Sequence, residues 1–297
     1  MGVILILGRD EDPCCRLVRE QLSACGRDVL LLPEDRLFPG LSFAWKPGSG
    51  REGHIEYGGR RVDFTAIDAI LSRAWGVPVA AEDFESVDGR YICAEWSALL
   101  VAWLHEMPCV VVNRLKPELW YKPQMNAADL AALVPQMPLK LPRSLVTTNS
   151  EDAIAFCRSV RSRVRYSPLT RLSQYRVQTD ADRDELVSLS RTLPLHLTEW
   201  IEGEAIDAFV VGSEVVFSDR NDRPNGGGRA AAARHCVSVA DALGLSFCKL
   251  SLVEASDGDW YCLDLDRVPQ IGECATELQL DIARALARGL SAVERAG

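Results

Sequence analysis

The sequence has few histidines, no excess of basic residues and no long apolar run. Lysine and arginine together number 33 against 42 aspartate and glutamate residues, which gives a formal net charge of -9. Neutralising the phosphates of a nucleic acid requires clustered Lys and Arg. The one basic run, residues 158–176, is interrupted by Pro168 and followed by acidic residues, a pattern typical of a solvated face. We therefore expect no nucleic-acid partner.

Signal and membrane segments are also missing. The apolar run at residues 3–7 is far too short to span a bilayer or to form a signal peptide, and acidic residues follow it directly. Its pattern is that of a first β-strand that ends in a loop. We expect a cytoplasmic protein without a membrane partner.

Residue patterns that mark several enzyme classes are absent as well. The ten cysteines form no C-x-x-C pair, and no Cys/His spacing is typical of zinc. None of the four histidines lies beside a nucleophile in a turn, which argues against a hydrolase. The first strand lacks a G-x-G-x-x-G turn, which argues against a dinucleotide oxidoreductase. Cys14 and Cys15, before a helix, are the best candidates for an exposed reactive thiol, with an incidental role as the simpler alternative.

The composition that remains is that of an ordinary folded protein. Hydrophobic residues make up 47% and charged residues 25% of the 297 residues, which is enough for two domains or three small ones. The first part alternates strand and helix, and this order predicts a parallel sheet covered by helices. A proline-rich stretch, residues 113–142, indicates a domain junction. We expect an N-terminal α/β domain at residues 1–115, a central unit at 116–194 and a C-terminal unit at 195–297.

Turn residues and apolar periodicity predict the remaining elements. Gly58 and Gly59 join two short strands in a hairpin, and Gly212 belongs to the turn of a second hairpin. The NGGG run at residues 225–228 is predicted to be a flexible loop, followed by a helix that ends at Gly244. Residues 113–142 are predicted to be loop outside one helix. The predicted helices are residues 13–22, 91–105, 127–133, 150–158, 182–191, 230–243 and 276–290.

Several stretches together resemble the ATP-grasp superfamily. LTEWIEGEAIDAFVVGSEVVFS, residues 197–218, resembles its hinge strand and following hairpin. HCVSVADALGLSFCKLSLVEASDGDWYCLDLDRVPQI, residues 235–271, is similar to its helix, core strand and metal-bearing strand. Earlier runs resemble the branch of ribosomal-protein-modifying ligases and microviridin-type peptide macrocyclases: Ser72-Arg73-Ala74-Trp75, YICAEWSALLVAWL, VVVNR, ELWYKPQM and LPRSLVTTNSEDAIAF. The order and spacing of these pieces carry the resemblance, which covers most of the chain.

This resemblance implies a fold and a chemistry. The fold is α/β, with α+β character in the C-terminal part: an ATP-grasp fold preceded by an N-terminal parallel-sheet domain. ATP-grasp ligases form an acyl phosphate from a carboxylate and ATP, and an amine then displaces the phosphate. The implied cofactors are ATP and Mg²⁺, with two ions held by oxygen ligands on adjacent strands. The implied substrate is a small molecule or a peptide, and a homodimer is one implied assembly because many relatives are dimers.

Two acids are the candidate metal ligands. Asp264 and Asp266 alternate on one strand, so their side chains face the same way and suit a shared divalent ion. The family usually has Glu and Asn at these positions, and an acid pair exposed to solvent is the alternative. Lys249, on the preceding strand, is a candidate catalytic residue that could bring positive charge to the site, or it could point to solvent.

Basic residues near the glycine-rich run are candidates for contacts with substrate or phosphate. Arg229 is the candidate catalytic residue of this group, and Arg220 and Arg223 lie on the other side of the run. In the family such residues can reach the substrate. Residues that only keep a loop soluble would have the same pattern.

The resemblance also implies a nucleotide-binding set. Glu199, Trp200 and Ile201 match the hinge stretch whose backbone meets adenine in the family, and Glu202 could meet the ribose. Asp207 matches an acid of the following hairpin. Arg165 is the candidate for offsetting the phosphate charge, although we expect strand alternation to make neither it nor Arg163 an obvious substitute for the family lysine.

Besides Asp264 and Asp266, three positions depart from the family pattern and put ATP and Mg²⁺ in question. Ser167 stands where a phosphate-binding Lys is expected, Ser251 where a third acid is expected, and Ala208 where an Arg is usual. Two hypotheses follow. The chain is either an ATP-dependent carboxylate–amine ligase, with a peptide among its candidate substrates, or a degenerate ATP-grasp protein that binds or regulates a partner without catalysis.

Overall fold

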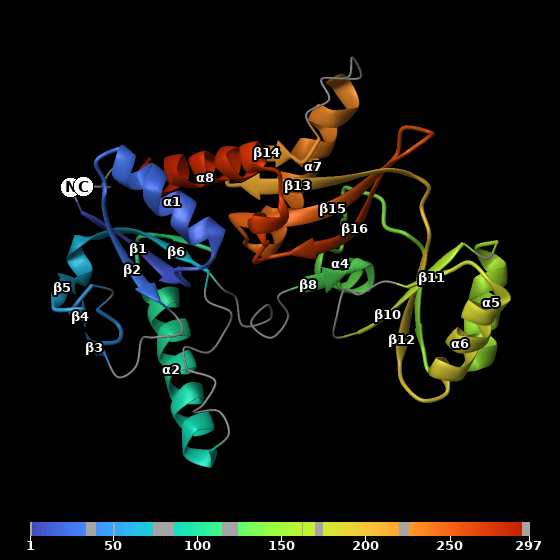
Figure 1. Ribbon diagram of the computed structural model, residues 1–297, viewed down its shortest axis with the longest axis horizontal. Coiled ribbons are helices and arrows are strands. Elements are labelled where there is room, and N and C mark those ends of the chain that lie inside the picture. The colour runs from blue at the N-terminus through green and yellow to red at the C-terminus, as the bar shows by residue number, and fades with distance from the viewer. Residues whose placement is uncertain are drawn as a thin grey trace.

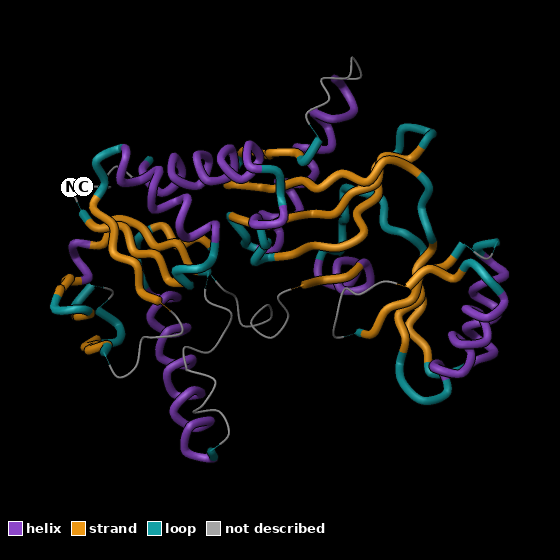
Figure 2. Tube along the Cα trace, in the orientation of Figure 1, coloured by secondary structure: helices purple, strands orange, loops and turns teal. Residues whose placement is uncertain are grey.

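The computed structural model describes residues 2–33, 40–49, 51–73, 86–114, 124–161, 163–169, 175–219 and 226–292. Within these residues the chain forms four sheets with helices packed against them (Figure 1). Figure 2 separates the strands of these sheets from the helices and loops. No helix in the described part of the chain combines the length and the apolar content that a membrane span requires. Ala74 and Trp75 of the predicted R-x-W motif lie outside the described residues.

The first sheet is parallel, as the alternation of strand and helix predicted. Its strands stand in the order β2, β1, β6, β7, with the bounds β1 (Val3–Gly8), β2 (Asp28–Pro33), β6 (Ile67–Ser72) and β7 (Val110–Val112). Every residue of β1 is buried, as expected for a central parallel strand covered on both faces. Between β1 and β2 runs α1 (Pro13–Ala24), where the Asp12 carboxylate accepts a 2.9 Å hydrogen bond from the Cys14 N–H and caps the helix.

The two faces of this sheet are covered by different elements. Ile4 and Ile6 face a cluster that includes α1 and α8 (Thr276–Ser291), whereas Leu5 faces α2 (Val87–Glu106). On the α2 side a small antiparallel sheet adds three strands, β3 (Leu41–Trp45), β4 (Gly53–Tyr57) and β5 (Arg60–Asp63). The predicted Gly58–Gly59 hairpin between β4 and β5 is confirmed, and both glycines have positive φ. Strand β3 was not predicted.

A second antiparallel sheet occupies the middle of the chain. Its order is β11, β10, β12, β9, with the bounds β9 (Ser144–Thr147), β10 (Val164–Pro168), β11 (Tyr175–Val177) and β12 (Leu195–Glu199). Two helices, α5 (Ser150–Ser159) and α6 (Asp180–Ser190), cover the outer face of this sheet (Figure 1). Asn149 caps α5 by accepting a 2.8 Å hydrogen bond from the Glu151 N–H. The opposite, inner face of this sheet is not covered by these two helices.

The largest antiparallel sheet has the order β14, β13, β15, β16, β8. Its strands are β8 (Gln124–Asn126), β13 (Gly203–Val211), β14 (Glu214–Phe217), β15 (Phe247–Ala255) and β16 (Trp260–Asp266). One face packs against α4 (Ala127–Leu133) and α7 (Gly226–Leu243) in a single apolar cluster. Two predictions were wrong in this part of the chain: Gly226 to Gly228 begin helix α7 instead of forming a loop, and β8 lies in a stretch predicted to be loop.

Helix α8 and the buried side chain of Asn113 join the first sheet to the largest one. Leu278 and Ile282 of α8 belong to one cluster with Ile4 of β1 and Phe209 of β13. Asn113, which follows β7, accepts hydrogen bonds from the Ser246 and Phe247 N–H groups and donates to the carbonyls of Phe247 and Arg267. Asn113, at the edge of the first sheet, therefore holds the start of β15 and the end of β16 in place.

Candidate functional site

One row of polar side chains crosses the largest sheet. The strand register places Asp207 opposite Ser251, Ser251 opposite Asp264, and Asp264 opposite Asn126. Directly opposed residues in a sheet share a face. The four side chains therefore lie in line on the face that α4 and α7 leave uncovered.

A second row lies two residues further along the same strands. Lys249 stands opposite Asp266, which stands opposite Gln124. Phe209 stands opposite Lys249 at the β13 end of this row, Phe247 lies beyond the row on β15, and both face the cluster formed with α1 and α8. The polar rows thus begin where the apolar contact with the N-terminal sheet ends. Asp264 and Asp266 share a face, as their spacing predicted, but neither is exposed to solvent.

Asp264 is the most strongly perturbed acid of these rows. It is 8% exposed, and burial raises the pKa of its carboxyl to about 6. Hydrogen bonding by Ser251 and the charge of Lys249 lower this pKa, whereas the nearby charges of Asp207 and Asp266 raise it. With this pKa the carboxyl is mostly ionised at neutral pH, and a cation bound beside it would offset the cost of burying its charge.

One carboxylate oxygen of Asp266 already accepts a hydrogen bond from the neighbouring backbone. Its Oδ1 accepts a 2.8 Å hydrogen bond from the Val268 N–H, and this bond lowers its pKa against the larger, raising effect of burial. The Gln124 side chain and Lys249 lower the same pKa. Asp266 is therefore a weaker candidate for a metal ligand than Asp264.

The remaining acid of the row is paired within the protein. Asp207 Oδ2 lies 3.5 Å from Lys249 Nζ, and Asp207 Oδ1 accepts a 3.1 Å hydrogen bond from the Ser251 hydroxyl. The same hydroxyl also interacts with Asp264, and its single proton serves one carboxylate at a time. Where a third acid would supply a metal ligand, Ser251 instead links two acids.

The inner face of the middle sheet forms the opposite wall. Arg165 and Ser167 of β10, together with His196 and Thr198 of β12, line a narrow space against Leu263 and Asn126. A neighbouring cavity of about 430 Å³ is lined by Arg165, Asp207, Ser251, Leu263 and Asp264, among others. Leu263 reaches this space where the β15–β16 register shifts. Residues of both sheets thus line one open cleft, in which Leu263 is apolar and Arg165, Asp207 and Asp264 are charged.

Arg165 corrects the expectation about strand alternation. Arg165 and Ser167 are two residues apart in β10, so they share a face, and both line the cleft, whereas Tyr166 points into the core with α5 and α6. Burial lowers the Arg165 pKa, and the charge of Asp264 acts in the opposite direction. Arg165 is therefore a cation on the same face of β10 as position 167, where the family lysine was expected.

The predicted hinge carries a stacked arrangement of side chains. The Trp200 ring lies between two guanidinium groups, with its centroid 3.8 Å from Cζ of Arg165 and 4.0 Å from Cζ of Arg176. The N–H groups of Glu199 and Trp200 donate to the carbonyls of Arg143 and Arg163 at 2.8 Å. These two N–H groups are therefore engaged within the protein.

The rest of the hinge lies toward solvent. Glu202 is exposed and forms a 3.3 Å ion pair with Arg163, and Ile201 is half-buried. Arg176 was not singled out in the sequence. Its only signal is the register that places it opposite Arg165, which no local pattern reveals.

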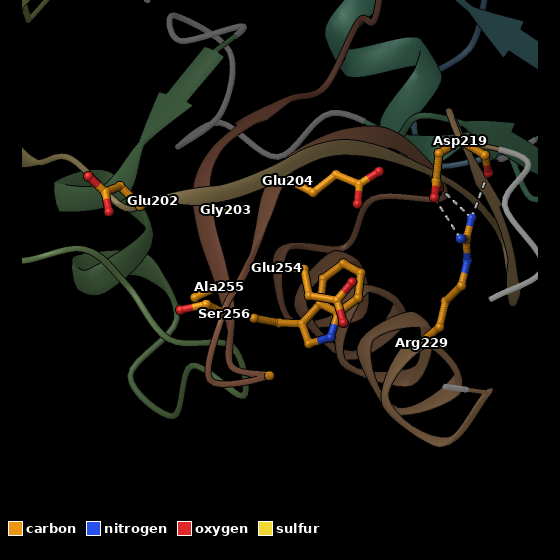
Figure 3. Close-up of a pocket in the computed structure, with 10 residues that line it drawn as sticks. Glu202, Gly203, Glu204, Asp219, Arg229, Glu254, Ala255 and Ser256 are labelled. Atoms are coloured by element: carbon orange, nitrogen blue, oxygen red, sulfur yellow. Dashed lines mark hydrogen bonds and ion pairs between the residues drawn. The ribbon is translucent and has the colours of Figure 1, made fainter. Parts of the chain in front are cut away.

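Arg229 lies on the other face of the largest sheet. Its guanidinium pairs with Asp219 at 2.6 Å and stacks on Phe217, in a cavity of about 480 Å³ that Glu204, Glu254 and Trp260 also line (Figure 3). Phe217 packs against Trp260 on the side covered by α7. The structure therefore does not bring Arg229 together with Asp264 or Lys249. Arg220 and Arg223 lie outside the described residues.

The cleft does not fit the two-ion arrangement that the resemblance implied. Among the described residues no three His, Cys, Asp or Glu side chains converge on one point where a metal could bind. Asp207 is held by Lys249 and Ser251, and Asp266 by the Val268 N–H. In these two rows, a divalent ion could bind Asp264, with Asp266 beside it. Any further ligands must come from a bound molecule or water.

Comparison with known proteins identifies the fold. No protein-family model matches the sequence, and no curated protein matches it significantly. Among solved structures, the ATP-grasp ligase PsnB complexed with minimal precursor, Mg and ADP superimposes with a TM-score of 0.77 at 17% identity, covering 97% of this chain and 96% of that one. The macrocyclase MdnC from Microcystis aeruginosa MRC, bound with precursor peptide MdnA, gives 0.77 at 16%, covering 97% and 99%.

A third solved structure, with a lower TM-score, has the same fold. The RimK domain protein ATP-grasp from Sphaerobacter thermophilus DSM 20745 gives a TM-score of 0.61 at 16% identity, covering 97% of this chain and 99% of that one. The sequence resemblance is thus confirmed at the level of the fold along almost the whole chain. This chain has the ATP-grasp fold, in the form found in the peptide macrocyclases.

Proposed function

We propose that this chain is an ATP-dependent ligase that activates a carboxyl group, with a peptide as its substrate. The observation that carries the proposal is the cavity of about 430 Å³ between the middle and largest sheets, lined by Arg165, Leu263 and Asp264. It combines an apolar surface for a base with a buried carboxylate and a cation for a phosphate chain. A cavity with these properties, lined by residues of the two sheets of an ATP-grasp fold, suits a nucleoside triphosphate.

The reaction that we propose has two steps. A carboxylate oxygen of the substrate attacks the γ-phosphorus of ATP, the bond to the bridging oxygen breaks, and ADP leaves with an acyl phosphate formed. An amine or hydroxyl group then attacks the acyl carbon, loses its proton, and releases inorganic phosphate. Arg165 and Lys249 are proposed to offset phosphate charge, because both lie beside Asp264.

The hinge is proposed to hold the nucleoside. Leu263 supplies an apolar contact for adenine, and Glu199 to Ile201 supply backbone groups, although the N–H groups of Glu199 and Trp200 are engaged elsewhere. Glu202 lies at the solvent side, where it could meet a ribose hydroxyl after release of Arg163. Asp207 would not contact the nucleotide itself but would position Lys249 and Ser251, which it holds by an ion pair and a hydrogen bond.

A peptide is the proposed substrate because two of the compared structures contain one. MdnC was solved with a precursor peptide and PsnB with a minimal precursor. We also propose that the chain acts in the cytoplasm, without nucleic acid or membrane, and that residues 1–115, 116–194 and 195–297 are its three units. A homodimer is part of the same proposal.

A non-catalytic ATP-grasp protein is the second candidate, and specific contacts favour it. Ser167 and Ser251 replace charged groups, and Ala208, whose side chain is buried in the cluster with α7, cannot contact phosphate. The Lys249–Asp207 pair neutralises part of the site without any ligand. Such a protein would bind a peptide or a partner enzyme and leave ATP intact.

Peptides that carry Asp or Glu together with Ser, Thr or Lys test both candidates. The chain is incubated with ATP, Mg²⁺ and each peptide, and phosphate release and peptide mass are measured. A ligase releases phosphate and yields a peptide lighter by one water, whereas Arg165→Ala slows this and the exposed Arg158→Ala does not. Peptide binding without phosphate release or mass change supports the non-catalytic candidate and contradicts the first.

A further inference from the structure

Lys249 holds a position that a metal ion would need. It projects from β15 between two acid-bearing strands, opposite Asp266 of β16 and 3.5 Å from Oδ2 of Asp207 on β13. Its side chain is 27% exposed, so most of it is enclosed by these neighbours. The ammonium group therefore lies among the carboxylates that face the cleft.

An ammonium group and a divalent ion compete for such a position. The ammonium group has three donors and no acceptor, so it cannot ligate a metal. Mg²⁺ requires roughly six oxygen ligands at about 2.1 Å, and a like charge nearby adds Coulomb repulsion. Lys249 therefore removes both ligand space and negative potential from one side of the site.

The oxygen atoms around Lys249 are already committed. Asp207 contacts Lys249 through one oxygen and Ser251 through the other. Asp266 accepts from the Val268 N–H, and the Asn126 Oδ1 accepts from the N–H groups of Ala128 and Asp129 at the start of α4. Asp264 is left as the principal carboxylate that a cation could bind.

We propose that Lys249 takes the place of one of the two divalent ions, so that a nucleotide bound in this cleft carries a single Mg²⁺. The inference rests on the proposed nucleotide-binding function and deepens it by setting the metal stoichiometry. Lys249 would act as a fixed cation beside the phosphates, and Asp264 would bind the remaining ion together with phosphate oxygens. The absence of a third acid at Ser251 and the presence of Lys249 are then one coupled change.

Manganese uptake tests this stoichiometry without any turnover. The full chain, in excess over the non-hydrolysable ATP analogue AMPPNP, is titrated with Mn²⁺, and free Mn²⁺ is counted by electron paramagnetic resonance. We expect one Mn²⁺ per bound nucleotide in the wild type and two in Lys249→Glu, which exchanges the cation for a carboxylate ligand. Lys249→Gln removes only the charge and should admit a second, weaker Mn²⁺.

A matched control and separate outcomes keep the test decisive. Lys46→Glu makes the same charge reversal at an exposed residue that pairs with Glu52, and it should leave the count at one. Two Mn²⁺ per nucleotide in the wild type, or one in both Lys249 variants, would overturn the proposal while leaving nucleotide binding intact. If AMPPNP does not bind to the wild type with or without Mn²⁺, the proposed function itself fails, and this inference with it.

Discussion

The Asp264 carboxyl shows how one buried residue couples the site to stability. Burial raises its pKa to about 6, above its ordinary value, so the folded chain binds its proton more tightly than the unfolded chain does. The stability associated with Asp264 is fully present below about pH 4 and is lost as the pH rises through about 6. At neutral pH the ionised carboxylate is therefore a cost to the apo protein.

Asp264→Asn should remove this cost. In metal-free buffer at pH 8 we expect the variant to unfold with a free energy about 1 to 3 kcal/mol higher than the wild type, and the difference should vanish near pH 4. Denaturant unfolding at both pH values measures it. Asp184→Asn, at an exposed position of α6, should show no such trend. A variant that is less stable than the wild type at pH 8 would show that the charge is well compensated.

The cysteines at the start of α1 are not exposed, contrary to the prediction from the sequence. Cys14 and Cys15 were the candidates for an exposed thiol, but both are buried, and burial raises the pKa of Cys14 to about 11 and that of Cys15 still further. Cys25, at the other end of the helix, is exposed. Both thiols lie in the first turn of α1, on the face that packs into the apolar cluster with β1 and α8.

Alkylation distinguishes the two ends of α1. Iodoacetamide at pH 8 under native conditions should modify Cys25 first, and Cys25→Ser should remove the fastest phase of labelling, since only a thiolate reacts quickly. Peptide mass mapping over time gives the order. Early modification of Cys14 or Cys15 would contradict the burial of these two thiols.

At the scale of elements, local sequence patterns predict the periodic helices and strands and the glycine turns. They do not predict short strands that form only by pairing with distant strands. The parallel β-α-β start, both glycine hairpins and helix α8 follow from local patterns that the structure confirms. Strands β3 and β8 have five and three residues and exist only through their neighbours, so no window of sequence reveals them. The missed strand β8 is the one that brings Gln124 and Asn126 into the polar rows.

The short helix α4 gives an element-scale prediction. Its capping box joins Asn126 and Asp129: the Asn126 side chain accepts from the Asp129 N–H, and the Asp129 carboxylate accepts from the Asn126 N–H at 3.0 Å. Asp129→Ala should lower the free energy of unfolding by about 1 kcal/mol. Denaturant unfolding measures the change, with the exposed Asp184→Ala as control. No loss of stability would mean that β8 is held by its pairing with β16 alone.

At the scale of the whole molecule, polar side chains at the edge of the first sheet fix the site-bearing strands. Arg73, which follows β6, is 2% exposed, pairs with Asp12 at 2.8 Å and donates to the Pro269 carbonyl at 3.0 Å. Asn113 bonds the ends of β15 and β16 in the same region. Sequence alone gave Arg73 only through resemblance, because its partners lie far away in the chain.

Asn113→Ala should loosen this junction. It leaves buried N–H and carbonyl groups of Phe247 without their partner, and we expect a loss of about 2 to 4 kcal/mol in the free energy of unfolding. Asn149→Ala, which removes only the cap of α5, should cost about 1 kcal/mol. Denaturant unfolding compares the two, and equal losses would show that the Asn113 contacts add little to the joining of the sheets.

The most direct test of the account is a calorimetric titration of ATP, with and without Mg²⁺, into wild type and Asp264→Ala. We expect ATP to bind the wild type in the cleft between the middle and largest sheets, more tightly with Mg²⁺ than without it. Asp264→Ala should lose most of the Mg²⁺-dependent part, whereas Asp184→Ala should match the wild type. Absence of ATP binding by the wild type, or Mg²⁺-dependent binding that survives in Asp264→Ala, would contradict the account.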